Sequence, residues 1–333
     1  MKAALLLKPG PIENQPLVLT DYPAPKPGPK EILIRITVCG LCHTDLHTVE
    51  GELVPPKLPI IPGHQIVGLV AGKGKEVRRF QEGDRVGVPW LFSTCRRCEY
   101  CREGRENLCE EARFTGFHVN GGYAQYATVN EGFAYPLPGE YSDLQAAPLL
   151  CAGIIGFRAL RQSGVKPGER LGLYGFGASA HIALQIARHW SCEVYVFTRS
   201  EGHRSLAKTL GAAWAGRAED EPSKKLHSAI LFAPAGELVH DALRSLRRGG
   251  TLALAGIHMS PIPETEYSLL YHERVLRSVA NSTRSDASEL LSLAPRVPVR
   301  SEVQAFALEQ ANQALQLLKE SRINGAGALT IPG

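Results

Sequence analysis

The sequence predicts an α/β protein of two domains, one rich in β-structure and one built on a doubly wound parallel sheet of six strands. Three observations lead to this fold. The chain has 333 residues, more than one hydrophobic core usually organises. Residues 1–151 are rich in proline, glycine and short β-like runs, whereas residues 152–280 alternate strand-like and helix-like runs. We assign residues 281–333 to the first domain, because their final extended run can return to it.

The β-rich domain is expected to open with a strand. Residues 1–9 hold only a short apolar segment before a lysine and a proline, which indicates a strand and not a signal peptide. Apolar residues at 32, 34, 36 and 38 alternate with other residues, as in a strand with one buried face. Similar runs occupy residues 66–71, 84–90 and 122–129. Turns rich in proline and glycine separate them.

Residues 152–280 are expected to form the parallel sheet. Between the strand candidates, Ile182, Ala183, Ile186 and Ala187 share one face at helical spacing. Strands that alternate with helices pair in parallel, because each helix returns the chain to the same edge of the sheet. The strand candidates are residues 170–174, 193–198, 212–215, 228–232, 251–255 and 275–280. The tail adds helical runs at 286–293 and 308–321, then an extended run at 326–331.

Composition narrows the class of protein. Hydrophobic residues make up 44% and charged residues 21%, and the net charge is +4 without a block of lysine or arginine. These values are ordinary for a globular protein and do not indicate nucleic-acid or membrane binding. No apolar run approaches the ~18 residues of a membrane span. We therefore expect a cytoplasmic protein, in which eight cysteines favour metal binding over disulfides.

The stretch from Cys39 to His47 contains as many potential metal ligands as a metal site would need. It follows a strand-like run and contains two thiols, two imidazoles, a hydroxyl and the carboxylate of Asp45. Thiolate and imidazole are preferred zinc ligands, and a nearby carboxylate commonly orients a ligating histidine. Cys42 is the first candidate ligand. We interpret Cys39 as a small buried side chain.

A catalytic zinc needs about three protein ligands and one open position. His64 is the second candidate, because the glycine before it lets the backbone approach closely. Cys151 is the third, since it lies at the predicted domain junction, where ligand sites are common. Taken alone, Cys151 would be interpreted as a buried hydrophobic residue. The combination of the three residues is what favours a metal site.

Four further cysteines predict a second metal site. Their pattern is C-x2-C-x2-C-x7-C, and four thiolates can close a tetrahedral shell that leaves no open position. Such a site is structural. The spacing alone leaves an iron–sulfur cluster or unliganded thiols as alternatives to zinc. The four residues are Cys95, Cys98, Cys101 and Cys109.

A glycine turn predicts a dinucleotide-binding (Rossmann) domain. Gly175 would make the tight turn after the strand 170–174, Gly177 would admit a pyrophosphate, and the helix opened by Ala178 would bind the anion through its N-terminus. This motif is weak in isolation. Here it opens the alternation of strands and helices that the motif requires.

The end of the second strand of this domain predicts the cofactor. An NAD site usually has an acidic residue there to accept the ribose hydroxyls, but this chain has Thr198, Arg199 and Ser200. Small hydroxyls and a guanidinium suit a 2′-phosphate, and Arg204 one helical turn later could add a second cation. We therefore predict a preference for NADP(H). The alternative is that Arg199 simply faces solvent.

Taken together, these motifs resemble the zinc-dependent medium-chain alcohol dehydrogenases over nearly the whole chain. The resemblance is carried by Cys42-His43-Thr44-Asp45-Leu46-His47, Gly63-His64, the four cysteines, Leu150-Cys151-Ala152-Gly153 and the glycine turn. The turn Phe197-Thr198-Arg199-Ser200-Glu201 is similar to that of the NADP-dependent aldehyde reductases and cinnamyl alcohol dehydrogenases in this family. The resemblance implies a GroES-like catalytic domain beside a Rossmann domain.

The resemblance also implies a ligand set for the catalytic zinc. It places this zinc on Cys42, His64 and Cys151, with Asp45 orienting a ligand. Zinc would polarise the substrate oxygen while hydride passes between the alcohol carbon and the nicotinamide.

The resemblance assigns the remaining site residues as well. Thr44 would accept the alcohol proton and pass it through the cofactor ribose to His47, which exchanges it with water. His43 would contact a cofactor phosphate. Trp90 and Leu53 would line the pocket, which suits a modest primary alcohol or aldehyde.

Three positions depart from the family pattern. Gln65 stands where the family usually has a glutamate behind the zinc, so the local charge is one unit more positive. Ala326 stands where an arginine often clamps the pyrophosphate. Ile155 replaces a threonine that packs on the nicotinamide, an exchange that an apolar contact tolerates.

The expected protein is an NADP(H)-linked zinc oxidoreductase of primary alcohols and aldehydes, with two zinc ions per chain. One alternative is an NAD-dependent dehydrogenase of short primary alcohols on the same zinc. Another is a non-catalytic NADP- or zinc-binding protein, which Gln65 and Ala326 suggest. From the family, we expect a homodimer or homotetramer.

Overall fold

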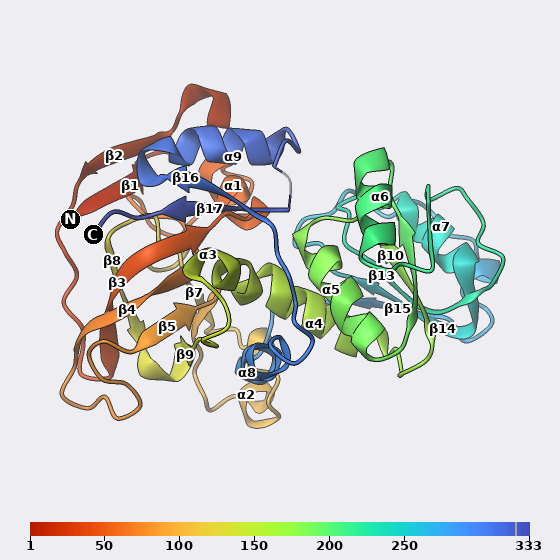
Figure 1. Ribbon diagram of the computed structural model, residues 1–333, viewed down its shortest axis with the longest axis horizontal. Coiled ribbons are helices and arrows are strands. Elements are labelled where there is room, and N and C mark those ends of the chain that lie inside the picture. The colour runs from red at the N-terminus through yellow and green to blue at the C-terminus, as the bar shows by residue number, and fades with distance from the viewer. Residues whose placement is uncertain (324) are drawn as a thin grey trace. The chain divides into compact units, whose positions relative to one another are not determined.

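A computed structural model describes residues 1–323 and 325–333 of the chain. The chain forms two compact units (Figure 1). Unit 1 contains Met1–Cys151, Ser282–Ser292 and Arg300–Gly333, and unit 2 contains Ala152–Asn281 and Leu293–Val299. The predicted α/β fold, a parallel six-stranded sheet with a separate β-rich part, is confirmed.

A seven-stranded sheet is the body of unit 1. The strand order is β16–β17–β3–β4–β5–β9, and β8 pairs with β3 outside this path. All pairs are antiparallel except β16 with β17. The strands are β3 (Glu31–Gly40), β4 (Gln65–Lys73), β5 (Arg85–Val88), β8 (Tyr126–Asn130), β9 (Tyr135–Pro136), β16 (Val303–Ala307) and β17 (Ala326–Thr330).

Strand β3 holds this sheet together because it pairs with three other strands. The alternating residues Ile32, Ile34 and Ile36 are at most 1% exposed, as the sequence pattern predicted. Strand β17 lies antiparallel to its end, with Leu329 opposite Cys39. The C-terminal run therefore returns to the first part of the chain, and Figure 1 shows β17 in blue beside the red β3.

Shorter elements complete unit 1. Two-stranded sheets are formed by β1 (Lys2–Leu6) with β2 (Leu17–Asp21) and by β6 (Leu91–Ser93) with β7 (Arg113–Phe114). The α-helices are α1 (His43–Glu50), α2 (Glu99–Arg102), α3 (Asp143–Ala146), α8 (Arg284–Leu293) and α9 (Ala311–Lys319). The 3₁₀ helices are η1 (Ile12–Asn14), η2 (Glu106–Leu108), η3 (Glu131–Phe133), η4 (Ala147–Leu150) and η6 (Leu308–Gln310).

Unit 2 contains the six-stranded sheet, whose strand order β12–β11–β10–β13–β14–β15 is that of a doubly wound nucleotide-binding domain. Every strand pair in it is parallel. The strands are β10 (Arg170–Tyr174), β11 (Glu193–Phe197), β12 (Trp214–Gly216), β13 (Leu226–Leu231), β14 (Leu246–Leu254) and β15 (Val275–Ser278). The helices are α4 (Ala152–Ser163), α5 (Ala178–His189), α6 (Glu201–Thr209), α7 (Leu238–Ser245) and the 3₁₀ helix η5 (Tyr267–Leu269).

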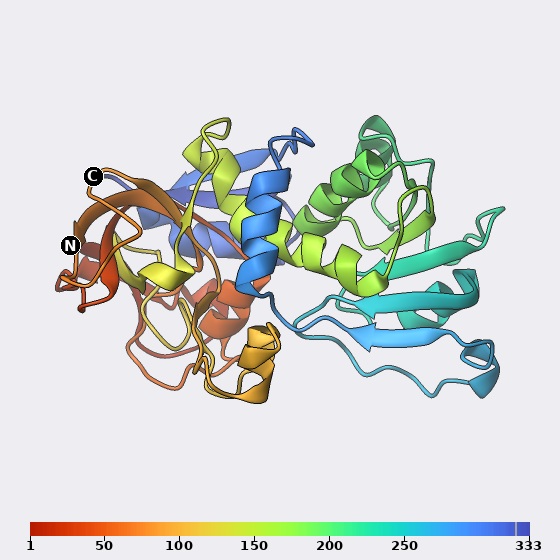
Figure 2. The ribbon, with the colours of Figure 1, turned by 90° about the horizontal axis from the view of Figure 1, so that it is seen from below.

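Helices cover both faces of this sheet. Tyr174 and Phe197 point to one face, where their rings stack 4.1 Å apart, and they pack in one cluster with Leu243 of α7. Helices α4 and α5 pack together, and a Cβ at Gly156 would lie 2.7 Å from the Ser179 carbonyl oxygen. Figures 1 and 2 show the helices and the sheet of this unit from two directions.

One helical stretch, Asp143–Ser163, is long and apolar enough by length and composition to cross a membrane. It combines α3, η4 and α4. Because 61% of its most apolar window is buried inside the protein, the stretch has the character of core helices.

Candidate active site

The Cys39–His47 stretch forms the end of β3 and the start of helix α1. Cys42 is the N-cap residue of α1, and its backbone N–H donates to Asp45 Oδ2 at 3.0 Å. A carboxylate at the third helical position that reaches back to the cap is a common helix start. The local sequence therefore places the Cys42 thiol and the Asp45 carboxylate on neighbouring positions of one turn.

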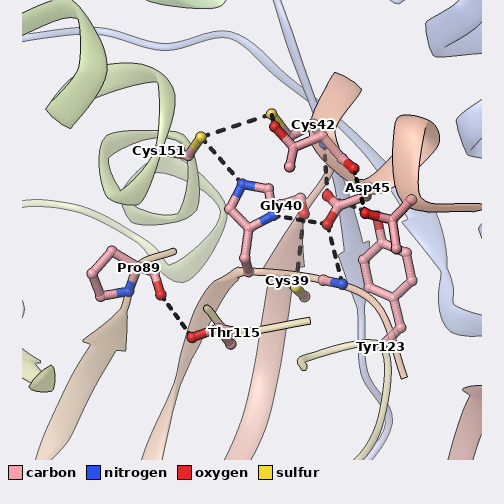
Figure 3. A network of polar contacts seen from close by, with 12 residues as sticks. Cys39, Gly40, Cys42, Asp45, Pro89, Thr115, Tyr123 and Cys151 are labelled. Carbon is pink, nitrogen blue, oxygen red and sulfur yellow. Dashed lines mark hydrogen bonds and ion pairs between the residues drawn. The ribbon is translucent and has the colours of Figure 1, made fainter. Parts of the chain in front are cut away.

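Three potential zinc ligands converge on this turn (Figure 3). Cys42 Sγ lies 3.7 Å from Cys151 Sγ, and His64 Nε2 lies 3.2 Å from Cys151 Sγ. The three donor atoms all lie within 4.8 Å of one another. Cys42 comes from the cap of α1, His64 from the residue before β4, and Cys151 from the end of η4. The structure thus brings together the three residues that the sequence suggested.

Asp45 is the hub of the polar contacts behind these donors. Its Oδ1 accepts hydrogen bonds from His64 Nδ1 at 2.8 Å and from the Gly63 N–H at 3.2 Å. The Tyr123 hydroxyl donates to its Oδ2 at 3.3 Å. The carboxylate fixes the His64 ring so that Nε2 faces the two sulfurs, which is the usual arrangement of a metal-binding histidine.

Glycine at position 63 makes this packing feasible. Gly63 has φ +96°, and a Cβ there would lie 2.4 Å from the Tyr123 ring. Tyr123 itself is fully buried. Sequence analysis missed Tyr123, because its 78-residue separation from Asp45 gives no local signal.

Burial and charge control the protonation of this cluster. Burial raises the pKa of Asp45, despite the favourable charge of His64. Burial alone would lower the pKa of His64, but the Asp45 carboxylate and Cys42 together raise it to about 10. The hydrogen bond from Cys151 holds the pKa of Cys42 well below its usual range, and the Cys42 sulfur raises the pKa of Cys151. Ionisation of one thiol disfavours ionisation of the other, so a bound cation would suit this group of donors.

The predicted proton-transfer residues lie along the same helix. Thr44 is 6% exposed, and its Oγ1 lies 3.6 Å from Cys42 Sγ. His43 is exposed, and its ring centroid is 6.3 Å from that of His47. His47 is paired with the carboxylate of Glu52, a residue that sequence analysis did not select.

An aromatic wall stands beside His64. The Trp90 ring meets the His64 ring edge-on at a centroid distance of 4.8 Å and stacks on Phe114 at 5.1 Å. Phe117 lies 5.9 Å from Trp90. The sequence suggested Trp90 and missed both phenylalanines. Leu53 was predicted to line the same pocket as Trp90. Its described backbone hydrogen bond is to His47, whose carbonyl oxygen accepts the Leu53 N–H at 3.0 Å.

The four-cysteine lobe forms a second group of potential ligands. The sulfurs of Cys95, Cys98, Cys101 and Cys109 all lie within 4.8 Å of one another. Backbone N–H groups of Arg97 and Cys98 lower the pKa of Cys95 to about 6. A backbone hydrogen bond lowers the pKa of Cys98, but burial and the other thiols raise it to about 12. Ionisation of one thiol makes ionisation of its neighbours less favourable, so a bound cation would suit the group.

The lobe is attached to the C-terminal part of unit 1. The Glu106 carboxylate is 5% exposed and accepts hydrogen bonds from the backbone N–H, Nε and Nη2 of Arg284 at 2.9, 2.9 and 3.1 Å. The guanidinium groups of Arg284 and Arg96 lie 5.2 and 5.5 Å from the Phe133 ring centroid. Charge pairing and ring contacts therefore fix the position of the lobe.

The glycine turn has the predicted form. Gly175 has φ +84°, and a Cβ there would lie 2.9 Å from the backbone nitrogen of Ala233. Gly177 is the N-cap of α5, and a Cβ added to it would meet no described atom within 4 Å. Ala178 opens α5. The space above Gly177 and the helix N-terminus suit a pyrophosphate.

The turn after β11 carries the predicted phosphate-binding residues. Ser200 is the N-cap of α6 and accepts a hydrogen bond from the His203 N–H at 3.3 Å. Arg204 Nη1 donates to the carbonyl oxygens of Thr198 and Arg199 at 2.9 and 2.8 Å. Arg204 therefore orders the turn by direct contact, whereas the Arg199 side chain is exposed.

The three departures from the family pattern occupy different environments. Gln65 is 3% exposed and packs on Gly40, where an added Cβ would lie 2.8 Å from the glutamine side chain. Ile155 is half-buried in α4, and Ala326 is the first residue of β17.

Comparison with known proteins identifies the class of enzyme. Residues 28–139 match the alcohol dehydrogenase GroES-like domain, and residues 180–296 match the zinc-binding dehydrogenase domain. With the fold and the donor set, these matches define a zinc-binding dehydrogenase.

Individual relatives identify the family. The chain is 47% identical to a probable alcohol dehydrogenase of Mycobacterium tuberculosis, with 99% of this chain and 97% of the relative covered. It is 32% identical to an aldehyde reductase of Escherichia coli, with 91% of each covered. A solved NAD-dependent alcohol dehydrogenase superposes with a TM-score of 0.92 at 25% identity over 100% of both chains. The chain belongs to the zinc-dependent medium-chain alcohol dehydrogenase family, whose members act on small alcohols and aldehydes.

Proposed function

We propose that this enzyme reduces aldehydes with NADPH, and oxidises the corresponding primary alcohols, at a zinc ion held by Cys42, His64 and Cys151. The observation that carries the proposal is the convergence of these donors, with Asp45 behind His64. Two sulfurs and an imidazole nitrogen suit zinc, and three protein ligands leave one position for substrate. The residues therefore fit the metal that the family implies.

Each residue of the site would have a separate role in the reaction. Bound zinc would act as a Lewis acid on the substrate oxygen, and NADP(H) would supply or accept the hydride. Thr44 would hold the substrate hydroxyl proton at Oγ1, a role supported by its 3.6 Å distance from Cys42 Sγ. His47 would take that proton after the cofactor ribose and exchange it with water. Asp45 would keep His64 oriented.

The remaining cofactor and substrate contacts are also proposed. Gly175, Gly177 and Ala178 would hold the pyrophosphate, and His43 would contact a cofactor phosphate. Thr198, Arg199 and Ser200 would bind the 2′-phosphate, with Arg204 shaping the turn. Trp90 would form an aromatic wall of the substrate pocket, and Leu53 would line it further out.

NAD(H) is the second candidate cofactor. It is favoured by one observation, the similarity to a solved alcohol dehydrogenase described as NAD-dependent. In this chain the exposed guanidinium of Arg199 supports NADP(H), because a bare ribose would offer it no anionic partner.

The four-cysteine lobe would hold a second zinc. Its four donors would close the coordination shell, so this ion would be structural. Clustered thiols of this kind need a reducing compartment, which supports a cytoplasmic location.

A panel of aldehydes and alcohols measured with NADPH and NADH tests the proposed function. We expect kcat/KM to be about tenfold or more higher with NADPH, a difference of ~1.4 kcal/mol in transition-state binding. Metal analysis should find two zinc ions per chain. A preference for NADH would support the second candidate cofactor. Absence of turnover with one zinc per chain would support a non-catalytic protein.

The exposed edge of the unit 2 sheet supports a homodimer. All four residues of the outer strand β15 are exposed, including Val275 at 42% and Leu276 at 37%, and Tyr271 nearby is 63% exposed. An apolar edge strand readily pairs with a second copy. We expect Leu276→Glu to convert a dimer into monomers in light scattering. A wild-type monomer would contradict the proposal, and a tetramer would require a further interface.

A further inference from the structure

The phenol of Tyr123 is a buried polar group that the proposed reaction does not use. The side chain is fully buried, and its hydroxyl donates to Asp45 Oδ2 at 3.3 Å (Figure 3). The backbone N–H of Cys42 donates to the same oxygen at 3.0 Å. Oδ1 of this carboxylate accepts from His64 Nδ1 at 2.8 Å and from the Gly63 N–H at 3.2 Å. The phenol therefore supplies one of four donors to a single buried carboxylate.

Backbone hydrogen bonds hold the Tyr123 ring beside the loop that carries His64. The Tyr123 N–H donates to the Pro62 carbonyl oxygen at 3.0 Å, and the Gly122 N–H donates to the Gly63 carbonyl oxygen at 2.9 Å. The ring packs closely on Gly63, where an added Cβ would lie 2.4 Å from it. None of these contacts uses the hydroxyl. Phenylalanine at position 123 would therefore keep this packing and remove only the hydrogen bond of the phenol.

We propose that Tyr123 is a positioning residue for the zinc site, which acts through the Asp45 carboxylate to fix the orientation of His64. A buried carboxylate oxygen that loses a donor has an unsatisfied lone pair, so the carboxylate can turn toward another partner. Such a turn moves the acceptor of the His64 Nδ1–H and changes the direction of Nε2, the nitrogen that would bind the metal. The phenol thus controls how firmly the site retains zinc, through two hydrogen bonds and without a bond of its own to the metal.

This inference rests on the proposed zinc site, and the first test measures the metal. Titration of the zinc-loaded enzyme with a coloured zinc chelator gives the affinity of each zinc site. We expect Tyr123→Phe to weaken zinc binding at the catalytic site about tenfold, or by ~1.4 kcal/mol, as is typical when a group behind a metal ligand is lost. The four-cysteine lobe should retain its zinc as in the wild type. An unchanged affinity at the catalytic site would overturn the inference.

Tyr174→Phe is the matched control. Tyr174 is also fully buried, and its hydroxyl donates to the Asp241 carbonyl oxygen in unit 2 at 3.4 Å. The variant removes the same atom from a buried hydrogen bond, so any general effect of a lost phenol should be similar. We expect wild-type affinity at both zinc sites. An equal loss of zinc in Tyr174→Phe and Tyr123→Phe would mean that lower stability releases the metal, and the inference would be wrong.

A second readout tests whether the hydroxyl acts through Asp45. In an Asp45→Ala background, Tyr123→Phe should cause no further loss of zinc affinity, because the acceptor is gone. If Asp45→Ala does not fold, NMR of ¹⁵N-labelled histidine tests the same link in variants that keep Asp45. The Nδ1–H signal of His64 should shift in Tyr123→Phe and stay unchanged in Tyr174→Phe. A loss that persists without the Asp45 carboxylate, or an unchanged His64 signal, would show that Tyr123 only packs the site.

The outcomes separate this inference from the proposed function. If Cys42→Ala binds as much zinc as the wild type, the proposed catalytic zinc site is wrong. If Cys42→Ala loses one zinc ion but Tyr123→Phe holds both ions as tightly as the wild type, the zinc site stands and the role of Tyr123 is wrong.

Discussion

Replacement of Cys42 by alanine is expected to abolish aldehyde reduction with NADPH while the fold remains. The variant leaves two of the three protein donors, His64 and Cys151, which is too few for a stable zinc site. We expect zinc to fall from two ions to one per chain and kcat/KM to fall by a factor of about 10³ or more, since the Lewis acid is lost. The backbone N–H of residue 42 still bonds to Asp45, so α1 should form normally.

Cys39→Ala is the matched control for this prediction. Cys39 lies three residues earlier and is completely buried, and burial raises its pKa well above the usual range. Its loss removes a packing atom, which should cost about 1 kcal/mol of the free energy of unfolding but leave both zinc ions bound. Retained turnover in Cys42→Ala, with normal circular dichroism, would show that the proposed zinc site does not catalyse the reaction.

Replacement of Arg199 by aspartate is expected to reverse or abolish the preference for NADPH. The exchange places a carboxylate where the proposed 2′-phosphate binds, so attraction becomes repulsion. We expect kcat/KM with NADPH to fall about 100-fold, or ~2.7 kcal/mol, while kcat/KM with NADH changes little or rises. Steady-state kinetics with both cofactors measure the ratio.

Arg247→Asp controls for the change in net charge. Arg247 is also exposed and lies near the start of β14, at the opposite end of the strands from the proposed cofactor site. The two variants alter the total charge equally, so a shared effect would be long-range electrostatics. If Arg199→Asp leaves the ratio of NADPH to NADH efficiency unchanged, the interpretation of the 198–200 turn is wrong.

Local patterns predicted much of the fold. Strand β10 occupies the expected residues 170–174, since a short apolar run followed by a glycine turn leaves few alternatives. The predicted strand at 212–215 instead begins at Trp214. Gly211 has φ +89°, and the Ala212 N–H bonds back to the Ala207 carbonyl, so both residues belong to the end of α6. Apolar character alone does not reveal such a helix cap.

The candidate site likewise contains some residues that the sequence indicates and others that it does not. Cysteine and histidine are common metal ligands, so Cys42, His64 and Cys151 could be selected from the sequence. Tyr123 and Phe114 could not, because tyrosine and phenylalanine are ordinary core residues and their positions depend on contacts between distant segments. Glu52 lies close in sequence to His47, but the contact between the two side chains depends on how the chain turns at Gly51.

The Glu106–Arg284 pair has a consequence for the topology of the chain. Its partners are 178 residues apart, and Arg284 lies just after the point where the chain re-enters unit 1. The pair therefore links the two segments of unit 1 that flank Ala152–Asn281, the larger segment of unit 2. Loop-closure entropy grows only with the logarithm of length, by about 0.6 kcal/mol for each doubling. Once these ends are joined, the length of the inserted segment has little effect on the stability of the β-rich unit, so the nucleotide-binding unit can change size without disturbing the zinc ligands in unit 1.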